Sequence, residues 1–243
     1  MHTKGFPWLL RFVAVLLLMA LITVGFFWIS QKQTPATSTK PASASPIHTV
    51  VLDAGHGGED GGAVGISGLV EKDVNLRLTL LLRDLLEANG VEVILTRETD
   101  TMLYDPSSDY VGRKKALDLA ERKRIAEETP DSVFVSIHMN TYPLQSCQGL
   151  QVWYSPNHPQ SQTLAKQIQT TAQELLQPNN DRAIKAAGSS IYLLHRLNTP
   201  AVLVECGFLS SPEESAKLSD PAYLQQLAFT LFAAIMQTEL SAE

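Results

Sequence analysis

The chain has 243 residues, of which 44% are hydrophobic and 18% are charged, and its net charge is −6. A chain of this length and composition can hold one sizeable globular domain. Its acidic balance excludes a nucleic-acid-binding protein, which would carry clustered basic residues. An acidic protein is also not attracted to an anionic polymer by its overall charge, so such a substrate would have to be held in a groove.

The N-terminus is an apolar segment that follows a basic start. Residues 12–29 are apolar at all but two positions, and Lys4 and Arg11 precede them. This length is near the lower limit for crossing a bilayer, and the basic flank favours a cytoplasmic N-terminus. A cleaved signal peptide is the alternative, but it would end in small residues, whereas this run ends in Phe-Phe-Trp-Ile. We therefore predict a membrane anchor in residues 1–30 and a domain outside the membrane, which would be secreted if the segment were cleaved.

A polar tether separates this segment from the folded domain. Residues 31–47 consist largely of Pro, Ser, Thr and Ala and offer almost nothing to bury. We expect the catalytic domain to comprise residues 48–243. Its two cysteines, Cys147 and Cys206, permit a disulfide outside the cell, but a buried free thiol is equally ordinary, and we expect both to be unpaired.

Within the domain, short apolar runs alternate with amphipathic stretches. The apolar or β-branched runs predict six strands, at residues 49–52, 91–96, 132–137, 150–154, 190–194 and 201–204. The amphipathic stretches predict four helices, at residues 72–89 with Gly90 at its end, at the charged and therefore surface-exposed 111–128, at 160–177 and from Asp220-Pro221 onward. Strands separated by single helices imply a single α/β domain whose mostly parallel sheet of about six strands has helices on both faces.

Three motifs with histidine or carboxylate side chains follow predicted strands. They are Asp-Ala-Gly-His-Gly-Gly at 53–58, Ser-Ile-His-Met-Asn at 136–140 and Val-Glu-Cys-Gly-Phe at 204–208. Since ligands bind at the carboxyl ends of parallel strands, we expect His56, His138 and Glu205 at one edge of the sheet. Glu71 adds a carboxylate where the helix at 72–89 begins. Two imidazoles and a carboxylate suit a catalytic zinc, which typically keeps three protein ligands.

Each proposed ligand also has a purely structural explanation. The glycines around His56 are compatible with a simple turn or a phosphate cradle, although the spacing and lysine of phosphate motifs are absent. Glu71 is favourable at any helix start, and a lone histidine such as His138 is often a hydrogen-bonded core residue. Together the three predict a zinc site.

Three polar residues are expected to orient the imidazoles by hydrogen bonds: Asp53 for His56, and Ser136 and Asn140 for His138.

Glu205 lies in an apolar run, Ala-Val-Leu-Val-Glu-Cys, where a charge is costly without a purpose or a partner. Beside a zinc site, it can take a proton from water and deliver it to a leaving amine. The structural alternative is a buried salt bridge to Arg182 or Arg196. Arg182 is also a candidate for the substrate groove.

At these motifs the chain resembles the zinc-dependent N-acetylmuramoyl-L-alanine amidases of the amidase type 3 family. The resemblance covers residues 49–238 and rests on LDAGHGGEDGGAVG, Glu71, SIHMN and PAVLVECGF. It implies that His56, Glu71 and His138 hold Zn²⁺ and that Glu205 is the catalytic carboxylate. The implied reaction hydrolyses the amide between N-acetylmuramic acid and the L-alanine of the peptidoglycan stem peptide. The anchor, the short tether and the lack of wall-binding repeats are most similar to the germination-specific branch, which acts on the spore cortex in sporulating bacteria.

Two other functions stay open at this point. A zinc peptidase would cut the stem peptide further from the sugar, and a wall-binding domain without catalysis would have no need for the carboxylate of Glu205. Glu205 follows His138 by only 67 positions, which leaves no room for the blocking helix of some family members. If the enzyme is restrained, we expect an activating partner protein or the polar loop 98–110 to be responsible, and we expect a monomer.

Overall fold

A computed structural model describes residues 44–107 and 110–241 of the chain. The predicted anchor and most of the predicted tether lie outside these residues. None of the helices in the described part combines the length and hydropathy of a membrane span. The first described element, β1 (Ala44–Pro46), pairs with β8 (Glu239–Ser241) at the other end of the domain, and Ile47 is buried in the core. Residues 44–47, which the composition placed in the tether, therefore contact the folded domain.

Six strands form the central sheet, which is the number that the sequence predicts. They are β2 (Thr49–Ala54), β3 (Glu92–Leu95), β4 (Ser132–Asn140), β5 (Gln151–Tyr154), β6 (Lys185–Ala186) and β7 (Ala201–Phe208), in the order β3-β2-β4-β7-β5-β6. The strands β3, β2, β4 and β7 are parallel, whereas β5 runs antiparallel to β7 and β6 follows the direction of β5. The parallel half brings the carboxyl ends of β2, β4 and β7 to one edge.

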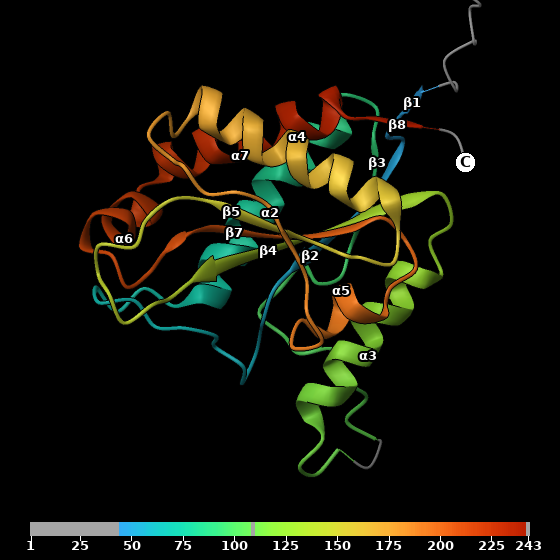
Figure 1. Ribbon diagram of the computed structural model, residues 1–243. Coiled ribbons are helices and arrows are strands. Elements are labelled where there is room, and N and C mark those ends of the chain that lie inside the picture. The colour runs from blue at the N-terminus through green and yellow to red at the C-terminus, as the bar shows by residue number, and fades with distance from the viewer. Residues whose placement is uncertain (1–43, 108–109, 242–243) are drawn as a thin grey trace, which may run out of the picture. The chain divides into compact units, whose positions relative to one another are not determined.

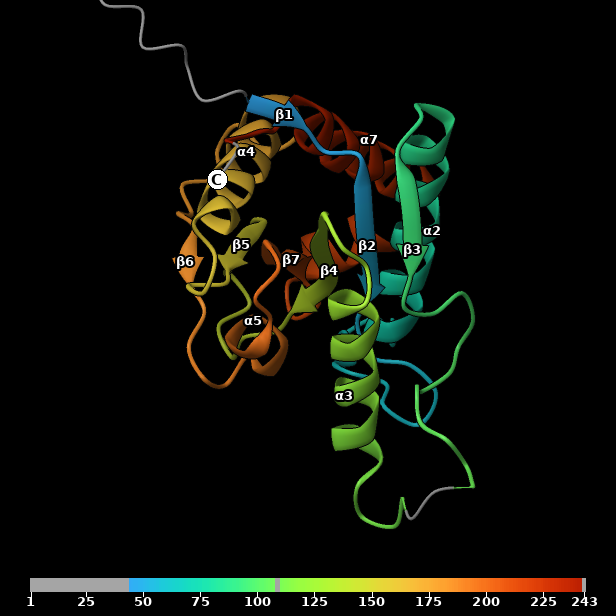
Figure 2. The same ribbon diagram turned by 90° about the vertical axis from the view of Figure 1, so that its right-hand side faces the viewer.

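Helices cover both faces of this sheet (Figures 1 and 2). The helices α2 (Glu71–Ala88), α4 (Pro159–Leu175) and α7 (Pro221–Gln237) pack on one face and enclose the larger core. On the other face, α3 (Lys114–Glu127) and α5 (Tyr192–Arg196) cover a smaller core with residues such as Phe134. The short α6 (Pro212–Ser219) follows β7. The prediction of a single α/β domain with helices on both faces is confirmed.

The structure corrects the prediction of a strand at residues 190–194. Residues 192–196 form the short helix α5, whose Leu193 and Leu194 pack into the smaller core, and the sixth strand is β6. A run of a few apolar residues is compatible with either a buried strand or a buried helix, so its composition did not separate the two. The helix α6 was not predicted, although Ser211 accepts a hydrogen bond from the backbone of Glu214 as its N-cap.

The helix α3 also differs from its prediction in the side that it buries. Its charged sequence indicated a surface helix with a thin apolar stripe, but the side chains that α3 buries are those of Asp118, Arg122 and Ala126. Arg122 is only 2% exposed and forms ion pairs with Asp118, at 2.9 Å, and with Asp53 on β2, at 2.5 Å. A polar network therefore joins α3 to the end of β2, where the site lies.

Candidate metal centre

His56 stands in a tight turn directly after β2. Its backbone has φ 64°, a left-handed conformation that is rare outside glycine. The side chain of Arg122 holds this turn, because it donates hydrogen bonds to the carbonyl oxygens of Ala54, at 2.9 Å, and of His56, at 2.7 Å. The turn brings Asp60 back to the imidazole, and Nδ1 of His56 lies 2.9 Å from Oδ2 of Asp60. The opposite ring nitrogen, Nε2, is thereby directed to the centre of the site.

Glu71 is the first residue of α2, and its side chain is buried. Its Oε2 accepts a hydrogen bond from the backbone N–H of Ala63 at 2.8 Å, and its Oε1 accepts one from Met139 at 3.1 Å. Gly62 lies so close that a Cβ atom there would be 2.5 Å from Oε2 of Glu71. The carboxylate is therefore fixed by loop, helix and strand at once.

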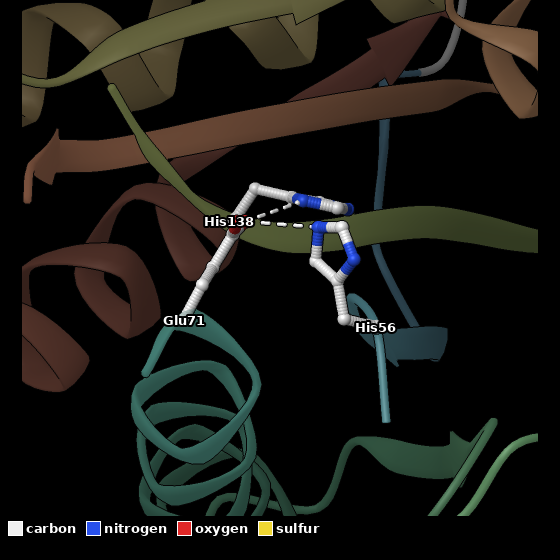
Figure 3. Close-up of side chains that lie close together, drawn as sticks. All are labelled: His56, Glu71 and His138. Carbon is white, nitrogen blue, oxygen red and sulfur yellow. Dashed lines mark hydrogen bonds and ion pairs between the residues drawn. The ribbon is translucent and has the colours of Figure 1, made fainter. Parts of the chain in front are cut away.

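His138 on β4 completes a cluster of three donors (Figure 3). Oε1 of Glu71 lies 3.0 Å from Nδ1 of His138 and 3.2 Å from Nε2 of His56. The ligand atoms of the three residues all lie within 4.8 Å of one another, and the two rings meet edge to face with centres 4.9 Å apart. Residues that are distant in the sequence thus converge on one point, as the three motifs predict.

The charges within this cluster suit a cation. Burial alone would raise the pKa of Glu71, but the hydrogen bonds from His138 and His56 hold that pKa well below its ordinary value. Burial alone would lower the pKa of His56, whereas its contacts with Glu71 and Asp60 raise it. The carboxylate is therefore ionised, as a metal ligand must be. Two imidazole nitrogens and one carboxylate oxygen fit a divalent metal site that leaves a position open for a reactant.

Glu205 lies beside this cluster. On the parallel strands β4 and β7, Glu205 is the Cα partner of His138, so both side chains project from the same face of the sheet. Burial raises the pKa of Glu205 to about 7. Its Oε2 is buried and has no hydrogen-bond partner among the described residues. A buried polar atom without a partner costs free energy, which favours a chemical role over a structural one.

The alternative of a buried salt bridge is wrong for Glu205. Within the described ranges Glu205 forms no ion pair; Arg182 instead donates to the carbonyl oxygen of Gln148 at 2.6 Å and to the side chain of Gln151 at 3.3 Å. Arg196, at the end of α5, is exposed.

The residues predicted to orient the imidazoles act elsewhere. Asp53 accepts hydrogen bonds from Thr96 at 2.8 Å, from Ser136 at 2.6 Å and from Arg122 at 2.5 Å, so it joins three elements instead of contacting His56. The reason is that Asp53 and Ser136 are Cα partners on β2 and β4 and face each other before the turn begins. In the described part of the chain, the side chain of Asn140 makes no hydrogen bond to His138, whose Nδ1 faces Glu71.

The sequence interpretation missed Asp60, Asn75 and Arg97. The side chains of Asn75 and Arg97 donate to the carbonyl oxygen of Gly55, at 3.0 Å and 3.1 Å, and so hold the turn before His56. Asn75 follows Glu71 by one helical turn, and that spacing was a readable signal for a second residue facing the site. No sequence signal distinguishes Asp60 from its neighbour Glu59 or locates Arg97 near Gly55, because both contacts depend on how the loop folds.

A mostly parallel α/β sheet with a His–Glu–His cluster that could hold a metal ion at its carboxyl edge, and an unpaired carboxylate beside it, is typical of a metal-dependent hydrolase. Comparison of the chain with known proteins identifies the family within this class. Residues 50–237 match the amidase type 3 family, described as N-acetylmuramoyl-L-alanine amidase, and the chain therefore belongs to this family.

Relatives and solved structures agree with this assignment. The chain is 37% identical to the germination-specific N-acetylmuramoyl-L-alanine amidase of Bacillus subtilis, over 77% of this chain and 78% of that protein. It is 32% identical to the B. subtilis amidase LytC, but covers only 37% of LytC. Among solved structures, the CwlD amidase from Clostridioides difficile, in complex with the GerS lipoprotein, is 38% identical, with a TM-score of 0.75 over 79% of this chain and 98% of CwlD.

Proposed function

We propose that this chain is a zinc-dependent amidase that hydrolyses the bond between N-acetylmuramic acid and the L-alanine of the stem peptide in peptidoglycan. One observation carries the proposal: Glu205, with a buried and unpartnered Oε2, is the Cα partner of His138 beside the convergent donors of His56, Glu71 and His138. The membership of the amidase family supports the same reaction.

In this proposal, Nε2 of His56, the carboxylate of Glu71 and His138 hold the metal. Zinc at this point would act as a Lewis acid that activates water and polarises the amide carbonyl. Glu71 offsets one positive charge of the metal. Asp60 accepts a hydrogen bond from Nδ1 of His56, which leaves Nε2 free to act as a ligand and fixes the orientation of the ring.

Glu205 is the group that moves the proton. Its side chain projects from the same face of the sheet as His138, next to the donors that would hold the metal. We assign to it the removal of a proton from the attacking water and the delivery of that proton to the amino group of L-alanine as the C–N bond breaks.

We further propose a role in remodelling of the cell wall or of the spore cortex during sporulation and germination. The similarity to the germination-specific amidase of B. subtilis and to the CwlD amidase supports it. The apolar residues 12–29 and the polar tether support a single-pass anchor with the catalytic domain outside the cell membrane, or a secreted domain if the segment is cleaved. The solved complex of CwlD with a lipoprotein supports a search for an activating partner of this chain, which we otherwise expect to be monomeric.

Product analysis tests the reaction. Purified peptidoglycan is incubated with the zinc-loaded protein, and the products are identified by mass spectrometry. A new amino terminus on L-alanine supports the amidase. Cleavage elsewhere in the stem peptide would show a peptidase, and retention on the polymer without cleavage would show a wall-binding domain. Cell fractionation tests the anchor separately, since an anchored protein stays with the membrane in high salt and is released by detergent.

A further inference from the structure

A row of polar side chains leads across the sheet away from the metal donors. His138 on β4, Glu205 on β7 and Gln151 on β5 are successive Cα partners on neighbouring strands. Cα partners project from the same face of a sheet, so these three side chains share the face that holds the donors. Arg182, which precedes β6, extends the row, because one terminal nitrogen of its guanidinium donates to Oε1 of Gln151 at 3.3 Å.

The guanidinium of Arg182 is held in place on several sides. Its Nε donates to the carbonyl oxygen of Gln148 at 2.6 Å, and its central carbon lies 4.5 Å from the centre of the ring of Phe208. Phe208 is the Cα partner of Asn140, two residues beyond His138, so the ring belongs to the same face. A guanidinium that is already fixed loses little conformational freedom when it binds an anion.

The positive charge of Arg182 has no carboxylate partner within the described part of the chain. Two of the five N–H groups of the guanidinium donate to Gln148 and Gln151, which leaves three without a protein acceptor there. Burial raises the pKa of Glu214, and the positive charge of Arg182 opposes that rise. The two oxygens of Glu214, however, accept hydrogen bonds from the backbone N–H groups of Gly149 and Phe208. An oriented, half-buried arginine without an acid is suited to an anionic ligand.

We propose that Arg182 binds a carboxylate of the stem peptide on the residue that follows L-alanine, an inference that rests on the proposed amidase function. Strands lie about 4.8 Å apart, so Gln151 is about 10 Å from the backbone of His138, and two extended residues span about 7 Å. A peptide whose scissile amide lies at Glu205 therefore brings its next residue to Arg182.

This assignment also accounts for how the site accepts an acidic substrate. A carboxylate near the reacting bond would otherwise lie close to the carboxylates of Glu71 and Glu205. The planar fork of Arg182 offers two parallel N–H groups to a carboxylate, a geometry that a primary amide does not satisfy equally well. Arg182 would thus select substrates whose second residue keeps its carboxylate free.

The test uses two N-acetylmuramoyl dipeptides that differ only in that carboxylate, which is free in one and converted to a primary amide in the other. The zinc-loaded full-length protein should favour the free acid by about 10- to 100-fold in kcat/KM, mainly through KM, as expected for a hydrogen bond to a charged group. In Arg182→Gln the ratio of the two kcat/KM values should fall to about 1, and in Arg182→Lys it should be intermediate.

Lys185→Gln is the matched control. Lys185 on β6 stands over the ring of Trp153 on the same face. Among the described residues it makes no hydrogen bond to Gln151 and no cation–π contact with Phe208, so its loss should keep the wild-type ratio. Zinc content and melting temperature verify that each variant is folded. If Arg182→Gln does not fold, the proposal is tested by the ratio of the two kcat/KM values in the wild type and by the same ratio in Arg182→Lys.

Three results would overturn the role of Arg182: a wild-type ratio near 1, an unchanged ratio in Arg182→Gln, or an equal loss in Lys185→Gln. Hydrolysis of neither dipeptide, together with intact peptidoglycan, would instead refute the amidase function itself.

Discussion

Replacement of Arg122 by methionine should destabilise the domain far more than its position on a charged helix suggests. Arg122 is buried, and its guanidinium donates to the carboxylates of Asp53, at 2.5 Å, and Asp118, at 2.9 Å, and to the carbonyl oxygens of Ala54 and His56. Both carboxylates are themselves 1% exposed. Methionine fills similar space but leaves two buried carboxylates without their ion-pair partner.

The expected loss follows from that arrangement. Removal of one partner of a buried ion pair typically costs about 3–5 kcal/mol. A domain of this size loses about 2–4 °C in Tm for each kcal/mol, so Arg122→Met should melt about 6–20 °C below the wild type. Metal affinity should fall as well, because the carbonyl oxygen of His56 loses its hydrogen bond from Arg122.

The loss should also depend on pH in a defined direction. Burial alone would raise the pKa of Asp53, but the charge of Arg122 and the hydrogen bond from Ser136 lower it below its ordinary value. A carboxyl whose pKa is lowered by folding stabilises the native state above its unfolded pKa, and this contribution is lost as the pH falls. Without Arg122, burial raises the pKa of Asp53 instead, and protonation relieves the penalty. The deficit of the variant relative to the wild type should therefore be largest near about pH 7 and shrink toward about pH 4.

Thermal and urea unfolding of metal-free protein at both pH values measures these differences. The matched control is Arg124→Met, two residues further along the same helix, where the guanidinium is half exposed and pairs with Glu121 and Glu128 on the surface. This control should change Tm little, because surface ion pairs contribute little to stability. If Arg122→Met lost no more stability than Arg124→Met, or if its deficit were the same at both pH values, the buried network would not have the role assigned to it.

Three further variants test the site. Glu205→Gln should keep one zinc per chain and lose about 10²- to 10⁴-fold in amide hydrolysis, and wild-type turnover would remove Glu205 from the mechanism. His138→Ala should lose zinc by metal analysis, whereas normal zinc content would contradict its role as a ligand. Asp60→Asn should bind zinc about 10- to 100-fold more weakly in competition with a chelator, since His56 loses the carboxylate that orients its ring, and an unchanged affinity would rule out that role.

Most of the fold could be predicted from the sequence, because most helices and strands have a hydrophobic pattern within their own residues. Apolar runs of strand length predicted β2, β4 and β7, and leucines at helical spacing predicted the helices α2 and α7. These patterns do not depend on contacts with distant parts of the chain. The site followed from one general rule. The carboxyl ends of parallel strands meet at one edge, so His56, His138 and Glu205 had to be neighbours once their strands were parallel.

The sequence pattern did not show which of several similar polar residues would contact the site. Asp53 and Asp60 are both acidic neighbours of His56 in the sequence, and the folded turn decides that Asp60 reaches the ring, through the left-handed backbone at His56 and the backbone hydrogen bonds between Gly57 and Asp60. The charged sequence of α3 made Arg122 a solvent-exposed charge. The sequence does not show that Asp53 on β2 lies beneath α3, or that Asp118, one turn earlier on the same helix, is buried with Arg122.

The sequence by itself therefore determined the family, the candidate metal donors and the carboxylate beside them, since these depend on residue identity at the ends of recognisable strands. The tertiary structure decided which side chains support that site, because their hydrogen bonds join β2, β3, β4 and α3 across long stretches of chain. Arg182 belongs to the second group. Only the register of β4, β7 and β5 places an unpaired arginine in line with Glu205.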